Sequence, residues 1–405
     1  MSRTIWFLML VTSCFVANAA SAQSGSAPKP KSVGRSTLHV VYFVPTDRRP
    51  EPEYRGRIER MLNDVQSFYR NGMNDRGYGP LTFELNRDAQ GALRVYDVAA
   101  KGPMRDYDRK SAWKVRAEVK DSLRKQNVDL DREFVVVFQL LLDWQGNKTE
   151  EIGSYVGSGD HTHGTAWVYD DAKLDPANLA SKEPGGFYNR PCSIGQFNTH
   201  YLGGLAHELG HAFGLPHDCE SALERERFGR SLMGGGNHTY GQERRGEGKG
   251  AFLSPASALP LSVHPLFAPN VPASEKMTCR FAELRAEEAK RTLILSGRLT
   301  DGPRVVGMVA RNDGVVPKDD YDAIAAATVV DAAGRFRVEI PDSKAGEFVM
   351  RLTAYGASGA KRSFAIPYVI ERGGRPNLAP FAEHAPLLDA TAAFQRNDRA
   401  VRSKS

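Results

Sequence analysis

The chain has 405 residues, of which 41% are hydrophobic and 25% are charged, which is typical of globular proteins and long enough for two domains. Its formal net charge is +6, but no dense block of lysine or arginine is present, so a nucleic-acid partner is not indicated. Beyond the N-terminus no apolar run is long enough for a transmembrane helix, and no transmembrane segment is predicted.

The N-terminus has the pattern of a secretory signal peptide over residues 1–22. A basic Arg3 precedes an apolar stretch at 5–16, and Ala-Ser-Ala at 20–22 is a small-x-small cleavage site. The apolar stretch is too short to span a bilayer comfortably. We therefore expect the protein to be exported, as a secreted, periplasmic or cell-surface protein.

The segment around the cleavage site leaves one alternative open. Cys14 could carry a lipid anchor, although residues 11–13 match the usual lipobox poorly. Residues 23–36 are rich in Ser, Pro, Lys and Gly, and we expect them to form a disordered lead-in. They are too short to resemble a full inhibitory prodomain.

The next part of the chain alternates strands with amphipathic helices. Strand segments are rich in β-branched and aromatic residues, and helical segments carry apolar residues at helical spacing. The expected strands are 38–44, 81–85, 93–96 and 134–140, and the expected helices cover 58–73 and 115–123. The order β-α-β-β-α-β predicts an α+β fold in which helices pack against a sheet.

Downstream lies the pattern H-E-x-x-H-x-x-G-x-x-H-D. On a helix, His207 and His211 project from the same face one turn apart, so both can bind one Zn²⁺. Glu208 lies beside the first ligand, where a carboxylate can take a proton from an activated water. Gly214 tolerates the positive φ of a sharp turn, which would bring His217 back as a third ligand. Three protein ligands leave one position open, as in catalytic zinc sites.

This pattern resembles the signature of the metzincin zinc endopeptidases, whose second feature is a methionine turn. Met233, in Ser-Leu-Met-Gly-Gly-Gly, fits that feature, and the resemblance implies that it forms an apolar floor beneath the zinc. The resemblance also implies that segment 153–169 is an edge strand along the substrate cleft, able to pair with an extended peptide. An aspartate after the third histidine, here Asp218, resembles the reprolysin branch, whereas the preceding Gly-Leu-Pro-His run resembles the matrixins. The branch therefore stays open. Tyr240 is a candidate for the tyrosine that other branches place after the methionine.

A second metal site is one interpretation of Asp160, His161 and His163. The two histidines would point the same way on a strand, and the group is loosely similar to the structural zinc site of matrixins. Solvated loop histidines are the alternative interpretation.

Cysteines are few, and the exported chain would keep Cys192, Cys219 and Cys279. Exported proteins can retain disulfides. Because Cys192 and Cys219 flank the active-site helix, we hypothesise a bridge between them that clamps this helix.

The character of the sequence changes near residue 272. The Pro-rich stretch 254–276 indicates a linker or a wrapping segment without regular structure, and the zinc-peptidase domain is predicted to span 37–272. Short strands separated by turn signals then indicate an immunoglobulin-like β-sandwich over 277–372, and residues 373–405 are expected to be a mobile tail. The expected strands are 292–299, 304–310, 327–330, 335–340, 348–355 and 363–369.

Together these features predict an exported zinc-dependent endopeptidase acting on a protein or peptide substrate. One alternative is a different zinc amidase or deacylase acting on glycan or cell-wall material. Another is a non-catalytic adhesin on a protease fold, although a binding module has no need of the base Glu208. The cleavage specificity and the oligomeric state are not predicted.

Overall fold

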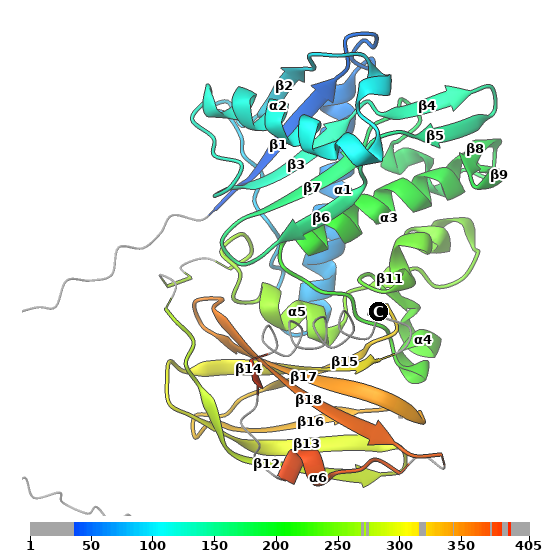
Figure 1. Ribbon diagram of the computed structural model, residues 1–405. Coiled ribbons are helices and arrows are strands. Elements are labelled where there is room, and N and C mark those ends of the chain that lie inside the picture. The colour runs from blue at the N-terminus through cyan, green and yellow to red at the C-terminus, as the bar shows by residue number, and fades with distance from the viewer. Residues whose placement is uncertain are drawn as a thin grey trace, which may run out of the picture. The chain divides into compact units, whose positions relative to one another are not determined.

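The computed structural model describes residues 36–268, 271–272, 275–315, 321–342, 344–372, 375–382 and 388–389 (Figure 1). The predicted signal peptide, the alternative anchor at Cys14 and all of the predicted lead-in except its last residue lie outside this range. Among the helices that the structure describes, none has the length and hydrophobicity to cross a bilayer.

The first part of the described chain is built around a five-stranded sheet with the order β2-β1-β3-β7-β6 (Figure 1). Its strands are β1 (Leu38–Val44), β2 (Val95–Ala99), β3 (Phe134–Gln139), β6 (Val156–Gly159) and β7 (Gly164–Tyr169). Four of them run parallel, whereas β6 runs antiparallel to β7 at one edge. β1 and β3 are almost entirely buried, which explains their continuous apolar sequences. Both strands were predicted, and both predictions are confirmed.

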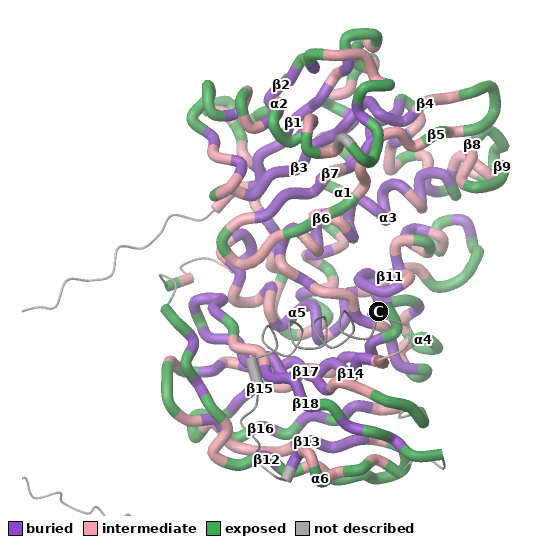
Figure 2. Tube along the Cα trace, viewed as in Figure 1, coloured by how far each residue is buried: buried purple, intermediate pink, exposed green. Residues whose placement is uncertain are grey.

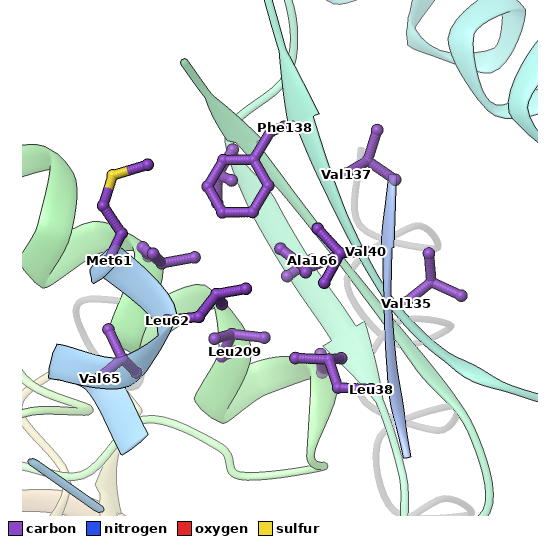
Figure 3. Packing of buried hydrophobic residues seen from close by; sticks show 14 of the residues in the cluster. Leu38, Val40, Met61, Leu62, Val65, Val135, Val137, Phe138, Ala166 and Leu209 are labelled. Atoms are coloured by element: carbon purple, nitrogen blue, oxygen red, sulfur yellow. The ribbon is translucent and has the colours of Figure 1, made fainter. Parts of the chain in front are cut away.

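Three long helices pack with this sheet. They are α1 (Tyr54–Asp75), α2 (Ala112–Arg124) and α3 (Ile194–Ala212). Figure 3 shows Met61, Leu62 and Val65 of α1 gathered with Leu209 of α3 and with sheet residues such as Leu38. α3 is buried along most of its length, as Figure 2 shows, so it is a central rather than a surface helix.

One predicted strand does not form. Residues 81–85 touch β1 only at the isolated bridge between Leu38 and Leu85. Their backbone is held by β1 at one point, where the Leu38 N–H donates to the Glu84 carbonyl at 2.7 Å, and by α1, where the Gln66 side-chain amide donates to the Phe83 carbonyl at 2.7 Å. The apolar alternation of this segment therefore serves packing against α1 rather than strand pairing.

Shorter elements surround α3. Before it lie η1 (Met104–Asp106), η2 (Arg109–Ser111), η3 (Pro176–Ala180) and the hairpins β4 (Leu142–Gln145) with β5 (Lys148–Glu151) and β8 (Pro184–Tyr188) with β9 (Arg190–Ser193). After it lie α4 (Ala222–Phe228), β10 (Arg230–Ser231), η4 (Gly235–His238), η5 (Gln242–Arg245) and β11 (Ala251–Phe252), with β10 and β11 paired in parallel.

Two antiparallel sheets follow, with the orders β12-β13-β16 and β15-β14-β17-β18-β19. Their strands are β12 (Arg280–Ala289), β13 (Thr292–Thr300), β14 (Val305–Gly314), β15 (Ile324–Val329), β16 (Arg335–Ile340), β17 (Gly346–Gly356), β18 (Lys361–Ile370) and β19 (Leu388–Asp389). Side chains of both sheets form one apolar cluster, which includes Leu295 of β13 and Met308 of β14. Strands are present at all of the segments predicted here.

The predicted linker 254–276 contains a helix, α5 (Pro255–Leu261). Ser254 caps it, because its hydroxyl accepts a hydrogen bond from the Ser257 backbone N–H at 3.0 Å, and a proline at the first helical position suits the helix start. Leu259 is buried in a cluster with residues of β14, β15 and β17. Pro255 and Pro260 therefore belong to a packed helix that joins the two parts of the described chain.

Two further differences concern the C-terminal sheets. β12 was not predicted, because nearly all of its residues other than Leu284 are at least partly exposed and many carry charge. The predicted mobile tail includes α6 (Ala379–Ala382) and β19, which pairs with β18. Phe381 is buried at 5.2 Å from the ring of Tyr368, so this part of the tail packs onto the sheet. Residues 375–378 precede α6 and are also described, whereas the other tail residues lie outside the described chain.

Candidate metal centre

Helix α3 carries the first two histidines. It begins at a capping box in which the Ser193 hydroxyl accepts from the Gln196 backbone N–H and the Gln196 side chain accepts from the Ser193 backbone N–H. His207 and His211 lie one turn apart near its C-terminal end, and their Nε2 atoms are 3.1 Å apart. The helix therefore sets the spacing of this pair.

A turn at Gly214 brings the third histidine to the other two. Gly214 has a φ of 80°, and a Cβ there would lie 2.9 Å from the Asp160 Cα, so a glycine is required on both grounds. Residues 214–221, which we call the return stretch, then bring the His217 Nε2 to 3.0 Å from the His211 Nε2. One nitrogen of each histidine lies within 4.8 Å of the others.

The hydrogen bonds of the rings suit metal binding. The Nδ1–H of His207 donates to the Leu232 carbonyl, and that of His211 donates to the Leu215 carbonyl, both at 2.8 Å. This arrangement leaves the Nε2 lone pairs directed toward one another. Burial lowers the pKa of His207 to about 3, so its ring is neutral, as a metal ligand must be. Three imidazole nitrogens at this spacing fit one Zn²⁺ with an open coordination position.

The carboxylate next to the first ligand is poised as a base. Burial raises the pKa of Glu208 to about 7, against the effect of a hydrogen bond from the Gly157 backbone N–H, which lowers this pKa. A carboxylate with a pKa near neutral pH can both accept and return a proton.

Glycines let the edge strand lie directly on α3 (Figure 1). A Cβ at Gly157 of β6 would lie 1.9 Å from the Glu208 carbonyl oxygen, and one at Gly159 would lie 2.1 Å from the Ala212 carbonyl oxygen. The backbone of β6 therefore passes beside the helix turn that carries the histidines. Of segment 153–169, predicted to be an edge strand, only β6 lies at the edge of the sheet, whereas β7 lies inside it between β3 and β6.

A cavity of about 390 Å³ opens beside Glu208. Its wall includes a cluster of three rings, in which the Tyr188 and His200 centroids are 3.3 Å apart and the His238 centroid lies 5.4 Å from His200 and 6.1 Å from Tyr188. An ion pair between Arg109 and Glu151, at 2.8 Å, also lines it. The cavity thus combines aromatic faces with charged hydrogen-bonding groups. The other lining residues are Ser154, Tyr155, Val156, Gly204, Glu208 and Asn237.

Two further predicted site residues lie close to the histidines. Met233 is fully buried under α3, where its sulfur would lie 2.4 Å from a Cβ at Gly210. Asp218 is also fully buried, and its carboxylate accepts hydrogen bonds from three serine hydroxyls on other segments. The donors are Ser231, Ser254 and Ser257, the last two at 2.7 Å.

The remaining accessory predictions do not place residues at the histidines. Tyr240 is buried with its hydroxyl donating to Asp64 of α1 at 2.7 Å, so it faces α1. Among the described residues, only His207, His211 and His217 gather as a candidate metal-binding group. His161 and His163 therefore form no second such group with Asp160; His161 packs beside Gly359, and His163 lies 3.6 Å from the Asp160 carboxylate.

The predicted disulfide is not formed, since Cys192, Cys219 and Cys279 are free thiols. Cys192 lies on β9 before the start of α3, whereas Cys219 lies in the return stretch beyond its end. A helix of 19 residues is about 28 Å long, and a disulfide needs Cα atoms within about 7 Å. Flanking the helix in sequence therefore does not bring the two thiols together.

Several residues at the site were not predicted. Tyr188, His200 and His238 come from three separate segments, and only folding stacks them. Tyr321, just before β15, stacks on His217 with ring centroids 3.7 Å apart. No spacing pattern links Tyr188, His238 or Tyr321 to the histidines. The one available signal was the place of His200 two helical turns before His207, on a helix that was expected.

Comparison with known proteins shows a shared fold. No protein-family model and no curated protein sequence matches the chain. Wild-type OgpA from Akkermansia muciniphila is 24% identical, with a TM-score of 0.69 over 86% of this chain and 96% of that one. A second crystal form gives a TM-score of 0.68 at 24% identity, over 86% and 95% of the two chains. Catalytically inactive OgpA, crystallised with an O-glycopeptide (glycodrosocin) substrate, gives 0.70 at 23% identity, over 86% and 96%. This chain therefore has an OgpA-like fold, with a mixed α/β part followed by antiparallel sheets.

Proposed function

We propose that this protein is a zinc-dependent endopeptidase that cleaves O-glycosylated peptides. The observation that carries the proposal is the convergence of three histidine nitrogens beside Glu208, at the wall of a cavity. The likeness in fold to OgpA, whose inactive form was crystallised with an O-glycopeptide substrate, supports the choice of substrate class.

The residues of the centre have distinct roles in this proposal. His207, His211 and His217 would hold the ion, which supplies Lewis-acid activation of the scissile carbonyl and of water. Glu208 takes the proton of the attacking water and returns it to the leaving amine. Its pKa near 7 suits both steps, because the group must change protonation state within one turnover.

The substrate would lie between β6 and the ring cluster of Tyr188, His200 and His238. An extended peptide can pair with the edge of β6, which lies on α3 beside Glu208. The cavity offers aromatic faces from Tyr188 and His200 and an ion pair between Arg109 and Glu151. Aromatic faces and charged hydrogen-bonding groups suit a sugar, which has apolar faces and many hydroxyls. We therefore place the glycosylated residue in this cavity.

The finer classification and the location of the protein are also proposals. An antiparallel edge strand, a third histidine after a glycine turn and a buried methionine beneath α3 support membership of the metzincins. The shared apolar cluster of the C-terminal sheets supports an immunoglobulin-like sandwich. The N-terminal residues, by their sequence, support export.

A matched pair of peptides tests the function. One peptide carries a single O-linked N-acetylgalactosamine on threonine, and the other has the same sequence without sugar. We expect cleavage of the glycosylated peptide, detected by mass spectrometry, and little or none of the other. Equal cleavage of both would contradict the substrate class but not the peptidase.

The Glu208→Gln variant tests the chemistry. It should bind zinc at the parent stoichiometry and lose about 10²- to 10⁴-fold in kcat, the usual contribution of a positioned acid–base group. Zinc content is measured by elemental analysis of the dialysed protein. A variant that cleaves as fast as the parent would exclude Glu208 as the base.

The parent protein tests the alternative function. If the parent binds the glycopeptide but does not cleave it, the result would favour a non-catalytic adhesin.

A further inference from the structure

The third histidine is in contact with the C-terminal sheets. The ring of Tyr321, just before β15, stacks on the His217 ring with centroids 3.7 Å apart and planes 28° apart. Tyr321 is 52% exposed, so it does not fill the core of its own sheets. Its position follows instead from the segment that comes next, which pairs with the return stretch.

Backbone contacts hold this arrangement in register. The Cys219 N–H donates to the Ala323 carbonyl at 2.7 Å, and Cys219 forms a parallel bridge with Ile324. Just after the return stretch, the Ala222 N–H donates to the Asp342 carboxylate at 2.7 Å. Ala323 is fully buried, which protects its hydrogen bond from water. These contacts therefore hold the return stretch against the residues that follow Tyr321.

The other two ligands are held differently. His207 and His211 donate to carbonyls of Leu232 and Leu215, which both precede the C-terminal sheets in the chain. The stacking contact with His217 instead comes from Tyr321. Partners of ligand side chains that orient the ring commonly change metal affinity when they are removed.

We propose that the C-terminal sheets are part of the metal centre, and that Tyr321 is a positioning residue that fixes the ring of His217 for metal binding. Tyr321 acts through its aromatic face, not through its hydroxyl. This inference rests on the metal site of the proposed function and does not depend on the glycopeptide substrate. It gives the C-terminal sheets a role beyond that of a separate binding module.

Zinc affinity tests the proposal without any substrate. The full-length protein and its variants are titrated with Zn²⁺ against a chromogenic chelator. Tyr321→Ala should raise the zinc dissociation constant about three- to tenfold, the range expected for loss of one aromatic pair. Tyr321→Phe keeps the ring and should stay within about twofold of the parent. The matched control is Val329→Ala in β15, because Val329 is 69% exposed, and this variant should leave zinc affinity unchanged.

The outcomes separate the two proposals. If Tyr321→Ala binds zinc as tightly as the parent, or if Val329→Ala weakens zinc binding equally, the positioning role is wrong. If Tyr321→Phe behaves like Tyr321→Ala, the hydroxyl and not the stacked ring matters, and the proposal is also overturned. A parent protein that binds zinc but cleaves no glycopeptide would overturn the proposed function alone.

Discussion

The candidate metal centre combines two kinds of structure, a regular helix and an irregular stretch. His207 and His211 belong to α3, so their spacing comes from helix geometry. His217 belongs to the return stretch, whose place is set by segments far away in the chain. Asp218 accepts from serines on β10 and α5 and from the cap of α5, and the Cys219 N–H donates to the segment before β15.

This difference teaches that one motif can depend on two levels of folding. The helical half, with His207 and His211, needs the buried last turns of α3 and the close packing of β6 against them. The irregular half needs the correct packing of α5 and of the C-terminal sheets. Substitutions distant in sequence should therefore affect the His217 side of the centre more than the His207 side.

The largest effect is expected at Asp218. Asp218→Ala leaves three buried serine hydroxyls without their acceptor, so the free energy of unfolding should fall by about 3 kcal/mol or more. Ser257→Ala is the control, because it removes one donor and should cost only about 1 kcal/mol. Urea unfolding of the zinc-saturated proteins measures both. Equal losses in the two variants would show that Asp218 does not hold the return stretch.

A smaller effect is expected on the helical half. Gly157→Ala places a methyl group 1.9 Å from the Glu208 carbonyl oxygen, so β6 must move away from α3. Overpacking of this kind costs about 1–3 kcal/mol. Peptide cleavage should fall as well, because β6 would no longer lie beside Glu208.

The matched control for this variant is Gly56→Ala in α1. Its added Cβ would meet only the Arg60 side chain at 3.5 Å, so stability should stay the same or rise slightly. Thermal unfolding of the two variants gives the comparison. A Gly157→Ala protein as stable and as active as the parent would mean that β6 tolerates a shift from α3.

Sequence reasoning was sufficient where structure is local. The spacing of His207, His211 and Gly214 was enough to predict the candidate metal site, and the composition of the buried strands was enough to predict those strands. It was insufficient where contacts are distant. Nothing near Tyr321 in the sequence indicates a histidine more than a hundred residues earlier. The helix α5 within the Pro-rich stretch was not predicted, because Pro255 at its first position suits a helix start as well as a loop.

The free energy of unfolding is expected to depend on pH through His264, which lies beside the end of α3. His264 follows α5 and is fully buried among aromatic rings, including Phe213 at the end of α3 and Phe134. Burial lowers the pKa of His264 from 6.5 to about 3. Below pH 6.5 the unfolded chain binds a proton that the folded protein does not bind until about pH 3. The free energy of unfolding should therefore fall by about 1.4 kcal/mol per pH unit as the pH drops through this window.

The His264→Gln variant isolates this contribution. Glutamine can still donate toward the Asp160 carbonyl, which lies 3.3 Å from the histidine Nε2, but it does not titrate. The difference in unfolding free energy between parent and variant cancels the other titrating groups. This difference should change with pH between 6 and 4; a constant difference would show that His264 does not contribute to acid sensitivity.

The smallest effect is expected from reduction. A Cys192–Cys219 bridge would have tied the start of the helical half covalently to the return stretch, and loss of such a bridge typically costs 2–5 kcal/mol. Because both thiols are free and noncovalent contacts hold the return stretch, dithiothreitol should leave the unfolding midpoint unchanged. Alkylation of the unfolded, non-reduced protein should label both cysteines in a peptide map. An unlabelled pair, or a midpoint that falls on reduction, would mean that the return stretch depends on a covalent link as well as on Asp218.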